Sequence, residues 1–86
     1  MPYIDPKDRA TLQLGRTPEN AGELNYLISS LFNEYITKHG LSYQILNDCM
    51  GAAQGASNEL YRRQAVSYEN HKLTINGDVY GQSEKV

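Results

Sequence analysis

The residues best suited to chemistry lie close together in the second half of the chain. The run Glu59-Leu60-Tyr61-Arg62-Arg63 is followed shortly by Tyr68-Glu69-Asn70-His71-Lys72. Tyrosine rings offer flat faces on which a nucleobase can stack. Arginine carries a planar fork that pairs with phosphate, and asparagine amides can read base edges. These residue types together favour a site for a nucleotide-like ligand.

Helical spacing sorts these residues into two sets. Tyr61, Tyr68 and Lys72 are seven and four residues apart, so a regular helix places them near one side. Arg62 lies about 100° around the same helix. Both sets can flank one groove only where a neighbouring helix completes it. We predict Tyr61 and Tyr68 for base stacking, and Arg62 and Arg63 for phosphate binding.

A plainer interpretation of the same residues stays open. The tyrosines Tyr61 and Tyr68 would then belong to the core of a helix interface, where aromatic rings are common. The charged residues would form ion pairs on a solvated surface, and these are Glu59, Glu69, Arg62 and Arg63. Spacing alone does not separate this interpretation from the binding site.

No pattern typical of catalysis or metal binding accompanies these residues. His39 is expected at a helix end and His71 on a polar stretch, and neither has a nucleophile at a suitable spacing. Cys49 falls on an apolar stripe and is predicted to be a buried small hydrophobe. The acidic residues are scattered, and no phosphate-binding glycine loop is present. We therefore expect no catalytic residues, no metal, no cofactor and no enzymatic activity.

Length and composition indicate one small helical domain over residues 1–86. A single cysteine cannot form an internal disulfide and favours a reducing compartment. Residues 1–20 carry prolines and charges rather than a signal peptide, and no apolar run approaches the ~20 residues of a bilayer span. We expect a cytoplasmic protein without membrane contact. The net charge of -2 argues against duplex nucleic acid as a partner.

The N-terminal arm, residues 1–16, is expected to hold one short helix. Asp5 is a suitable cap, Pro6 suits the first helical position, and Asp8 suits the first turn. One or two turns should run through about Leu12 and end near Gly15.

A longer helix is predicted over residues 18–39. The signal Thr17-Pro18-Glu19 gives a cap, a proline and an acid in order. An apolar stripe follows at three- and four-residue spacing, comprising Leu24, Leu27, Ile28, Leu31, Phe32 and Tyr35. Gly40 is the expected stop.

The second long helix should open at Ser42 and run to about residue 74, with a bend near Ser67. Asn76-Gly77-Asp78 reads as a turn, after which Val79-Tyr80 can pack back. Residues 81–86 are expected to form a frayed tail. The short link at Gly40-Leu41 predicts an antiparallel hairpin of the two helices.

The hairpin has arms of unequal length, which predicts self-assembly. At ~1.5 Å per residue the arms extend about 33 Å and about 50 Å, so the far end of the second arm has no cover within its own hairpin. Gly51 and Gly55 each cost roughly 1 kcal/mol relative to alanine in a helix. Close approach of another helix would offset that cost, whether it comes from a second copy or from the first arm. Another copy of the chain is the simplest cover, since symmetric homo-oligomers are common.

Five motifs resemble a widespread family of small helical proteins of tailed phages, prophages, bacteria and archaea. They cover about 60 residues and occur in the same order, with a distinctive close: Gly22-Glu23-Leu24-Asn25-Tyr26, Tyr43-Gln44-Ile45-Leu46-Asn47-Asp48, Glu59-Leu60-Tyr61-Arg62-Arg63, Tyr68-Glu69 leading to Lys72, and Asn76-Gly77-Asp78-Val79-Tyr80. One departure is Ser67, where relatives often carry proline.

The chain is further similar to the phage anti-CBASS nucleotide sponges. That resemblance implies a homotetramer in the host cytoplasm that sequesters cyclic oligonucleotide immune signals of the cyclic GMP-AMP class without cleaving them. It adds Asn25, Tyr26, Asn47 and Lys72 as further ligand-binding candidates. The alternatives are a protein–protein interaction module that takes a partner helix and no small molecule, and a small phosphodiesterase.

Overall fold

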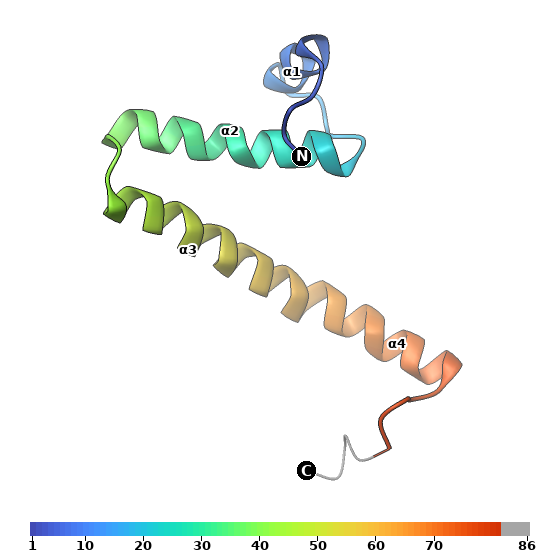
Figure 1. Ribbon diagram of the computed structural model, residues 1–86. Coiled ribbons are helices and arrows are strands. Elements are labelled where there is room, and N and C mark those ends of the chain that lie inside the picture. Colours follow the sequence, from blue (N-terminus) through green and yellow to red (C-terminus); the bar gives the residue numbers. More distant parts are fainter. Residues whose placement is uncertain (82–86) are drawn as a thin grey trace. The chain divides into compact units, whose positions relative to one another are not determined.

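The chain is all-helical over the residues that the structure describes, and no strand occurs among them. A computed structural model describes residues 1–81. The helices are α1 (Pro6–Gln13), α2 (Ala21–His39), α3 (Tyr43–Leu60) and α4 (Val66–Asn76), with a π-helical turn, Tyr61–Ala65, between α3 and α4 (Figure 1). The fold class predicted from the sequence is therefore confirmed at this level.

The chain divides into two compact units. The N-terminal unit is Met1–Cys49, and the C-terminal unit is Met50–Val86, of which residues 50–81 are described. α3 begins in the first unit and ends in the second. Each unit is described by itself below.

α1 follows its predicted signals closely. The Asp5 carboxylate accepts a hydrogen bond from the Lys7 N–H at 2.8 Å, and Pro6 occupies the first turn. The helix packs against α2 (Figure 1), and Leu12 is 3% exposed in this contact. Gly15 then takes a φ of 106°, a conformation that glycine adopts without steric cost.

α2 begins three residues later than predicted. The cap is Asn20, whose side-chain oxygen accepts from the Glu23 N–H at 2.9 Å, rather than Thr17. The sequence offers two possible caps, Thr17 and Asn20. Asn20 is the cap that forms, because the Glu23 carboxylate also accepts a hydrogen bond from the Glu19 N–H at 3.0 Å. The end at His39, with Gly40 at a φ of 89°, is as predicted.

Arg16 ties the arm to α2 through a group of carboxylates that we call the Arg16 clasp. Its guanidinium holds both carboxylate oxygens of Glu23, at 2.8 and 3.2 Å, and contacts Glu19 at 3.0 Å. Asp8 lies 3.9 Å away. Glu23 is 6% exposed. The hydrogen bond from Arg16, followed by that from the Glu19 backbone, lowers the pKa of Glu23 below its usual 4.5.

The first turns of α3 complete the N-terminal unit. Ser42 caps the helix as predicted, its hydroxyl accepting from the Ile45 N–H at 3.2 Å. The Tyr35 hydroxyl donates to Asp48 at 2.9 Å, and this bond raises the pKa of Tyr35. Cys49 is buried, at 8% exposed, which confirms its prediction as a small core hydrophobe.

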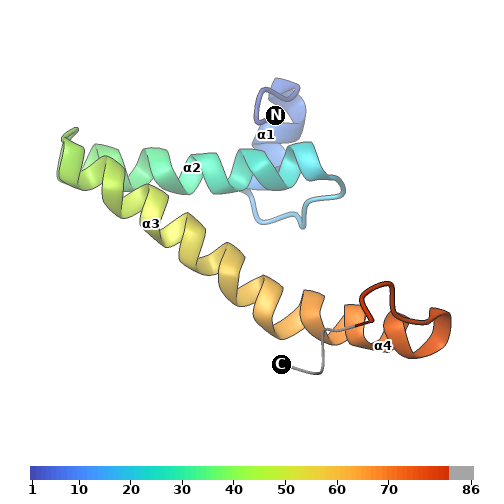
Figure 2. The ribbon, with the colours of Figure 1, turned by 60° about the horizontal axis from the view of Figure 1, so that its bottom comes forward.

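The C-terminal unit has no buried residue among those described. Its helical stretch runs through the π-helical turn to Asn76, two residues beyond the predicted end. The irregularity lies at 61–65 and not at Ser67, whose hydroxyl donates to the Arg63 carbonyl at 3.3 Å. Gly77, at a φ of 90°, ends α4, and Figure 2 shows the chain reversing there. The predicted tail is described only at residue 81; residues 82–86 lie outside the described residues.

Candidate functional site

The π-helical turn fixes which side chains of the C-terminal unit share a face. The Val66 N–H donates to the Tyr61 carbonyl, five residues back instead of four. One extra residue in the turn rotates everything after it by about 100° relative to a regular helix. Tyr61 is thus aligned with Val66 and, beyond it, with Asn70 and Leu73. Such single π turns occur often at functional sites.

This rotation changes the grouping that spacing predicted. Tyr61 and Tyr68 are seven residues apart and would share a side on a regular helix, but only Tyr61 faces the hollow described next. Tyr68 instead lies beside Lys72, whose ammonium stands 5.8 Å from the ring centroid. The predicted grouping of Tyr61, Tyr68 and Lys72 on one side is therefore wrong. Tyr61 lines the hollow, and Tyr68 and Lys72 form a separate cation–π pair.

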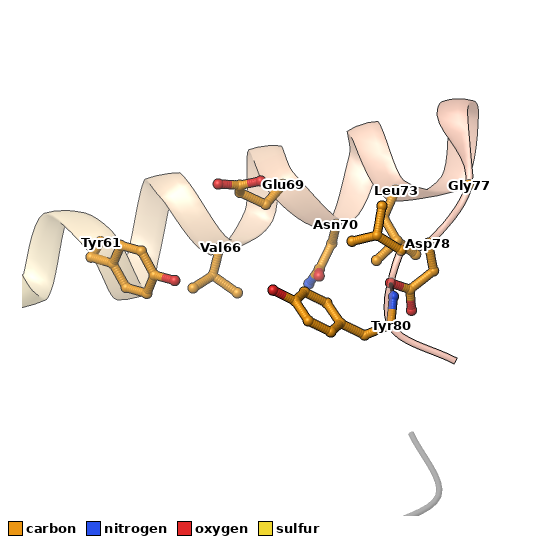
Figure 3. A pocket seen from close by; sticks show the side chains of 9 residues that line it. Tyr61, Val66, Glu69, Asn70, Leu73, Gly77, Asp78 and Tyr80 are labelled. Carbon is orange, nitrogen blue, oxygen red and sulfur yellow. Dashed lines mark hydrogen bonds between the residues drawn. The ribbon is translucent and has the colours of Figure 1, made fainter. Parts of the chain in front are cut away.

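A pocket of about 390 Å³ lies between α4 and the segment that follows it. Figure 3 shows Tyr61 and Tyr80 on either side of Val66, with their hydroxyl groups turned toward the space between them. The apolar part of the lining is Tyr61, Val66, Leu73, Val79 and Tyr80. The polar part is Glu69, Asn70 and Asp78, beside the Gly77 backbone.

The wall opposite α4 is held by a local turn. The Asp78 carboxylate accepts a hydrogen bond from the Tyr80 N–H at 2.8 Å, which is a turn typical of aspartate. Gly77 donates its N–H to the Leu73 carbonyl at 2.9 Å and allows the chain to reverse. The predicted packing of Val79-Tyr80 back onto the helix is confirmed, because both residues line the pocket.

The two arginines lie outside the pocket lining. Arg62 pairs with Glu59, three residues before it, and both side chains are exposed. This ion pair is one that the plainer interpretation of the sequence predicted. An exposed pair of this kind contributes little to stability, about 0.2–1 kcal/mol. Arg63 is exposed as well, so both arginines are accessible to an anion.

The remaining candidates lie in the N-terminal unit. The Tyr26 hydroxyl accepts from the Gln13 amide at 3.0 Å, and Arg9 stands 5.7 Å from its ring, so Tyr26 holds α1 in place. Asn25 accepts from the Ser29 hydroxyl at 3.2 Å. Asn47 is exposed on α3. These three residues belong to the N-terminal unit, whereas the pocket belongs to the C-terminal unit.

Of the polar and aromatic residues in the described lining, only Tyr61 was predicted as ligand-binding from the sequence, and Glu69, Asn70, Asp78 and Tyr80 were not. A signal for Tyr80 was present, since Asn76-Gly77 reverses the chain and the aromatic residue follows within a few positions. Glu69 and Asn70 had no such signal, because their alignment with Tyr61 depends on the π-helical turn.

The described residues were also compared with the patterns of metal sites and membrane spans. No cluster of three or more histidine, cysteine, aspartate or glutamate side chains that could hold a metal ion occurs within residues 1–81. His39 packs its ring against Tyr35, with centroids 4.5 Å apart. Over the same residues, no helix has the length and apolar character that a membrane span requires.

Comparison with known proteins identifies the family of the chain. A family model described as a domain of unknown function, DUF6899, matches residues 1–79. The chain therefore belongs to that family. No curated protein and no solved structure matches it.

Proposed function

We propose that this member of the DUF6899 family is a non-catalytic, self-assembling binding protein that sequesters a cyclic oligonucleotide signal of the cyclic GMP-AMP class. The observation that carries the proposal is the pocket of the C-terminal unit, where Tyr61 and Tyr80 face a common space. Arg62 and Arg63 lie on the same π-helical turn as Tyr61. Aromatic faces and arginine forks in one segment match the bases and phosphates of such a ligand.

Assembly is supported by a stripe of exposed apolar residues on α2. Leu24, Ile28, Leu31 and Tyr35 recur at spacings of four, three and four, the seam of a helix–helix contact. All four are exposed, and Leu31 is 65% exposed. Contiguous apolar surface of this kind typically marks an interaction site. We propose that other copies of this chain cover the stripe. The resemblance to nucleotide sponges implies that the assembly is a tetramer. We further propose that the two long helices of each copy form an antiparallel hairpin.

The glycines of α3 support the same proposal. Within residues 50–81, a Cβ placed on Gly51 or Gly55 would meet no atom within 4 Å beyond the adjoining residues and the nearby backbone of its own helix. Nothing in residues 50–81 therefore explains why glycine stands there at roughly 1 kcal/mol each. Close approach of a second copy is the explanation we propose.

Sequestration requires affinity and copy number, not catalysis, so the scarcity of catalytic groups is compatible with it. A ligand with two bases and two phosphates has near two-fold symmetry. A pocket on a dimer axis offers each half of such a ligand the same tyrosine and arginine.

Calorimetry with a panel of cyclic di- and trinucleotides tests the binding claim. We expect saturable heat with at least one member, and intact ligand after the protein is denatured. Arg62→Ala should weaken binding by about 1–3 kcal/mol, the range for a charged hydrogen bond. Lys38→Ala, at the end of α2, is the matched control. Absence of heat with every member rejects the ligand, and turnover over hours would show a phosphodiesterase instead.

Sedimentation tests the assembly claim separately. Leu31→Glu places a charge in the proposed seam and should convert the assembly to single chains at micromolar concentration. Leu14→Glu is the matched control, since Leu14 is exposed on the arm and outside the stripe. The apolar stripe also suits the helix of a different protein. Single wild-type chains, with a stoichiometric protein partner recovered from a host lysate and no small molecule, would favour that interaction module.

A further inference from the structure

We infer that the pocket between α4 and residues 77–80 is a guanine subsite, in which the Glu69 carboxylate accepts hydrogen bonds from the Watson–Crick edge of the base. This inference rests on the proposed function and specifies which part of the ligand enters the pocket. The size of the pocket is the first argument. About 390 Å³ lies near the lower end of the range for small-ligand sites, and suits one base with its sugar.

The walls of the pocket suit a flat aromatic ring. Tyr61 and Tyr80 stand at its two ends, and Val66 lies between them (Figure 3). Leu73 and Val79 extend the apolar lining. Tyrosine and aliphatic surfaces stabilise a base by stacking and by burial of its faces, without a requirement for charge.

The charges of the pocket exclude phosphate from its interior. Among residues 1–81, two carboxylates, Glu69 and Asp78, line it, and no lysine or arginine does so. The cations of this region, Arg62, Arg63 and Lys72, belong to the same helical stretch but lie outside the lining. This separation suits a nucleotide whose base enters the pocket while its phosphates stay with the arginines.

The Glu69 carboxylate is available to a ligand. Within residues 1–81 it makes no hydrogen bond and no ion pair, whereas Asp78 is engaged with the Tyr80 N–H. An ionised carboxylate is an acceptor only, with two oxygens side by side. It therefore selects a group that presents two neighbouring N–H donors.

Guanine is the base that meets this requirement. Its N1–H and its N2 amino group point the same way, so one carboxylate can accept from both. Its O6, next to N1–H, can accept from the amide of Asn70, which lines the same pocket. Adenine and cytosine place a ring nitrogen acceptor beside their amino group, and a carboxylate repels that acceptor. A site built for two donors discriminates strongly against a ligand that lacks one.

An arginine side chain from another protein also presents paired N–H donors. The observations favour the base for two reasons. The described lining is mostly aromatic and aliphatic, and the cations of the same helical stretch, Arg62, Arg63 and Lys72, would repel a cationic ligand. The cationic ligand is therefore an outcome that the test must detect.

Nuclear magnetic resonance of the full chain with nucleosides tests the subsite without the phosphates. We expect guanosine to shift the amide signals of Val66, Glu69, Asn70 and Tyr80, and inosine, which lacks the N2 amino group, to bind roughly tenfold more weakly. Adenosine should produce no shift at the same concentration. Equal shifts with guanosine and adenosine would overturn the inference. Shifts with arginine amide and none with guanosine would overturn it in favour of a cationic partner.

Substitutions connect the subsite to the cyclic ligands. Glu69→Gln keeps the shape of the side chain and removes one of the two equivalent acceptors, so cyclic di-GMP affinity should fall roughly tenfold or more. His71→Ala, two residues further along α4 and outside the described lining, should leave the affinity unchanged. Tyr80→Phe should retain most of the stacking, and Tyr80→Ala should lose roughly five- to hundredfold.

The two proposals fail in different ways. Binding of cyclic di-AMP and cyclic di-GMP with equal affinity, unaffected by Glu69→Gln, would reject the guanine subsite and leave sequestration intact. Guanosine shifts without binding of any cyclic nucleotide would reject sequestration and retain the subsite. Absence of binding by every nucleoside and every cyclic nucleotide would reject both.

Discussion

The two units of this chain are stabilised in different ways. The N-terminal unit, Met1–Cys49, has buried side chains and side-chain hydrogen bonds between its elements, such as Gln13 to Ser30 at 2.7 Å and Tyr35 to Asp48 at 2.9 Å. The C-terminal unit has no buried side chain among residues 50–81. Most helical stability in proteins comes from packing of an apolar face. The comparison teaches that contacts within the first unit stabilise it, and it supports our proposal that the second unit gains stability from a partner surface.

The largest effect should come from the small core of the first unit. Leu12→Ala should reduce the free energy of unfolding by about 2–5 kcal/mol, since a buried leucine loses both its transfer free energy and its packing. Urea unfolding followed by circular dichroism measures it. Leu14→Ala is the control, because Leu14 is 88% exposed, and it should change little. Equal effects would mean that Leu12 is not the centre of a core.

Acid should weaken the first unit specifically. The folded-state pKa of Glu23 is lowered, so its contribution is present above its unfolded pKa of about 4.5 and is lost as the pH falls through the lower, folded value. The melting temperature should therefore decrease as the pH is lowered below about 4.5. Glu23→Gln should remove most of that slope and lower stability at neutral pH. Glu19→Gln is the matched control, since the Glu19 side chain is 76% exposed. A slope unchanged by Glu23→Gln would contradict the role of the Arg16 clasp.

The glycines of α3 distinguish a free helix from a contacted one. In an isolated helix, Gly51→Ala and Gly55→Ala should each raise stability by about 1 kcal/mol. If another copy lies against them, each added methyl group should instead loosen the assembly. We expect the second result, measured as an increase in the dissociation constant by sedimentation equilibrium. A tighter or unchanged assembly would show that the glycines face solvent.

The smallest effect should come from the exposed ion pair of the second unit. Glu59→Gln removes the partner of Arg62 and should change the free energy of unfolding by less than about 1 kcal/mol. The same substitution frees Arg62 and should strengthen binding of an anionic ligand slightly. Thermal unfolding and calorimetry measure the two effects. A large loss of stability would mean that the second unit depends on its own surface contacts.

Local signals predicted much of the fold from the sequence. Two predicted caps begin helices, Asp5 for α1 and Ser42 for α3. Two predicted glycines end helices with a positive φ, Gly40 for α2 and Gly77 for α4. The start of α2 was wrong because Thr17 and Asn20 both offer a cap, and the choice depends on Glu23 and Arg16 from outside the local pattern. Boundaries of this kind are decided by contacts that sequence spacing does not contain.

The candidate site was predicted in part. Tyr61 was named and lines the pocket, while Tyr68 and Lys72 were named and form a separate pair. The difference arises at the π-helical turn, where no glycine or proline marks the extra residue. Every assignment beyond residue 61 that assumed a regular helix was rotated by about 100°. The pairing of Glu69 with Tyr61 could therefore not be found from a 3.6-residue period.

Amide hydrogen exchange at several protein concentrations tests the central claim most directly, because it reports on both units in one experiment. We predict that α1 and α2 keep their protection on dilution, while the amides of residues 50–76 lose theirs as the assembly dissociates, and regain it when a bound cyclic nucleotide is present. Strong protection of residues 50–76 in a single chain at the lowest concentration, without ligand, would contradict the claim that the second unit needs a partner.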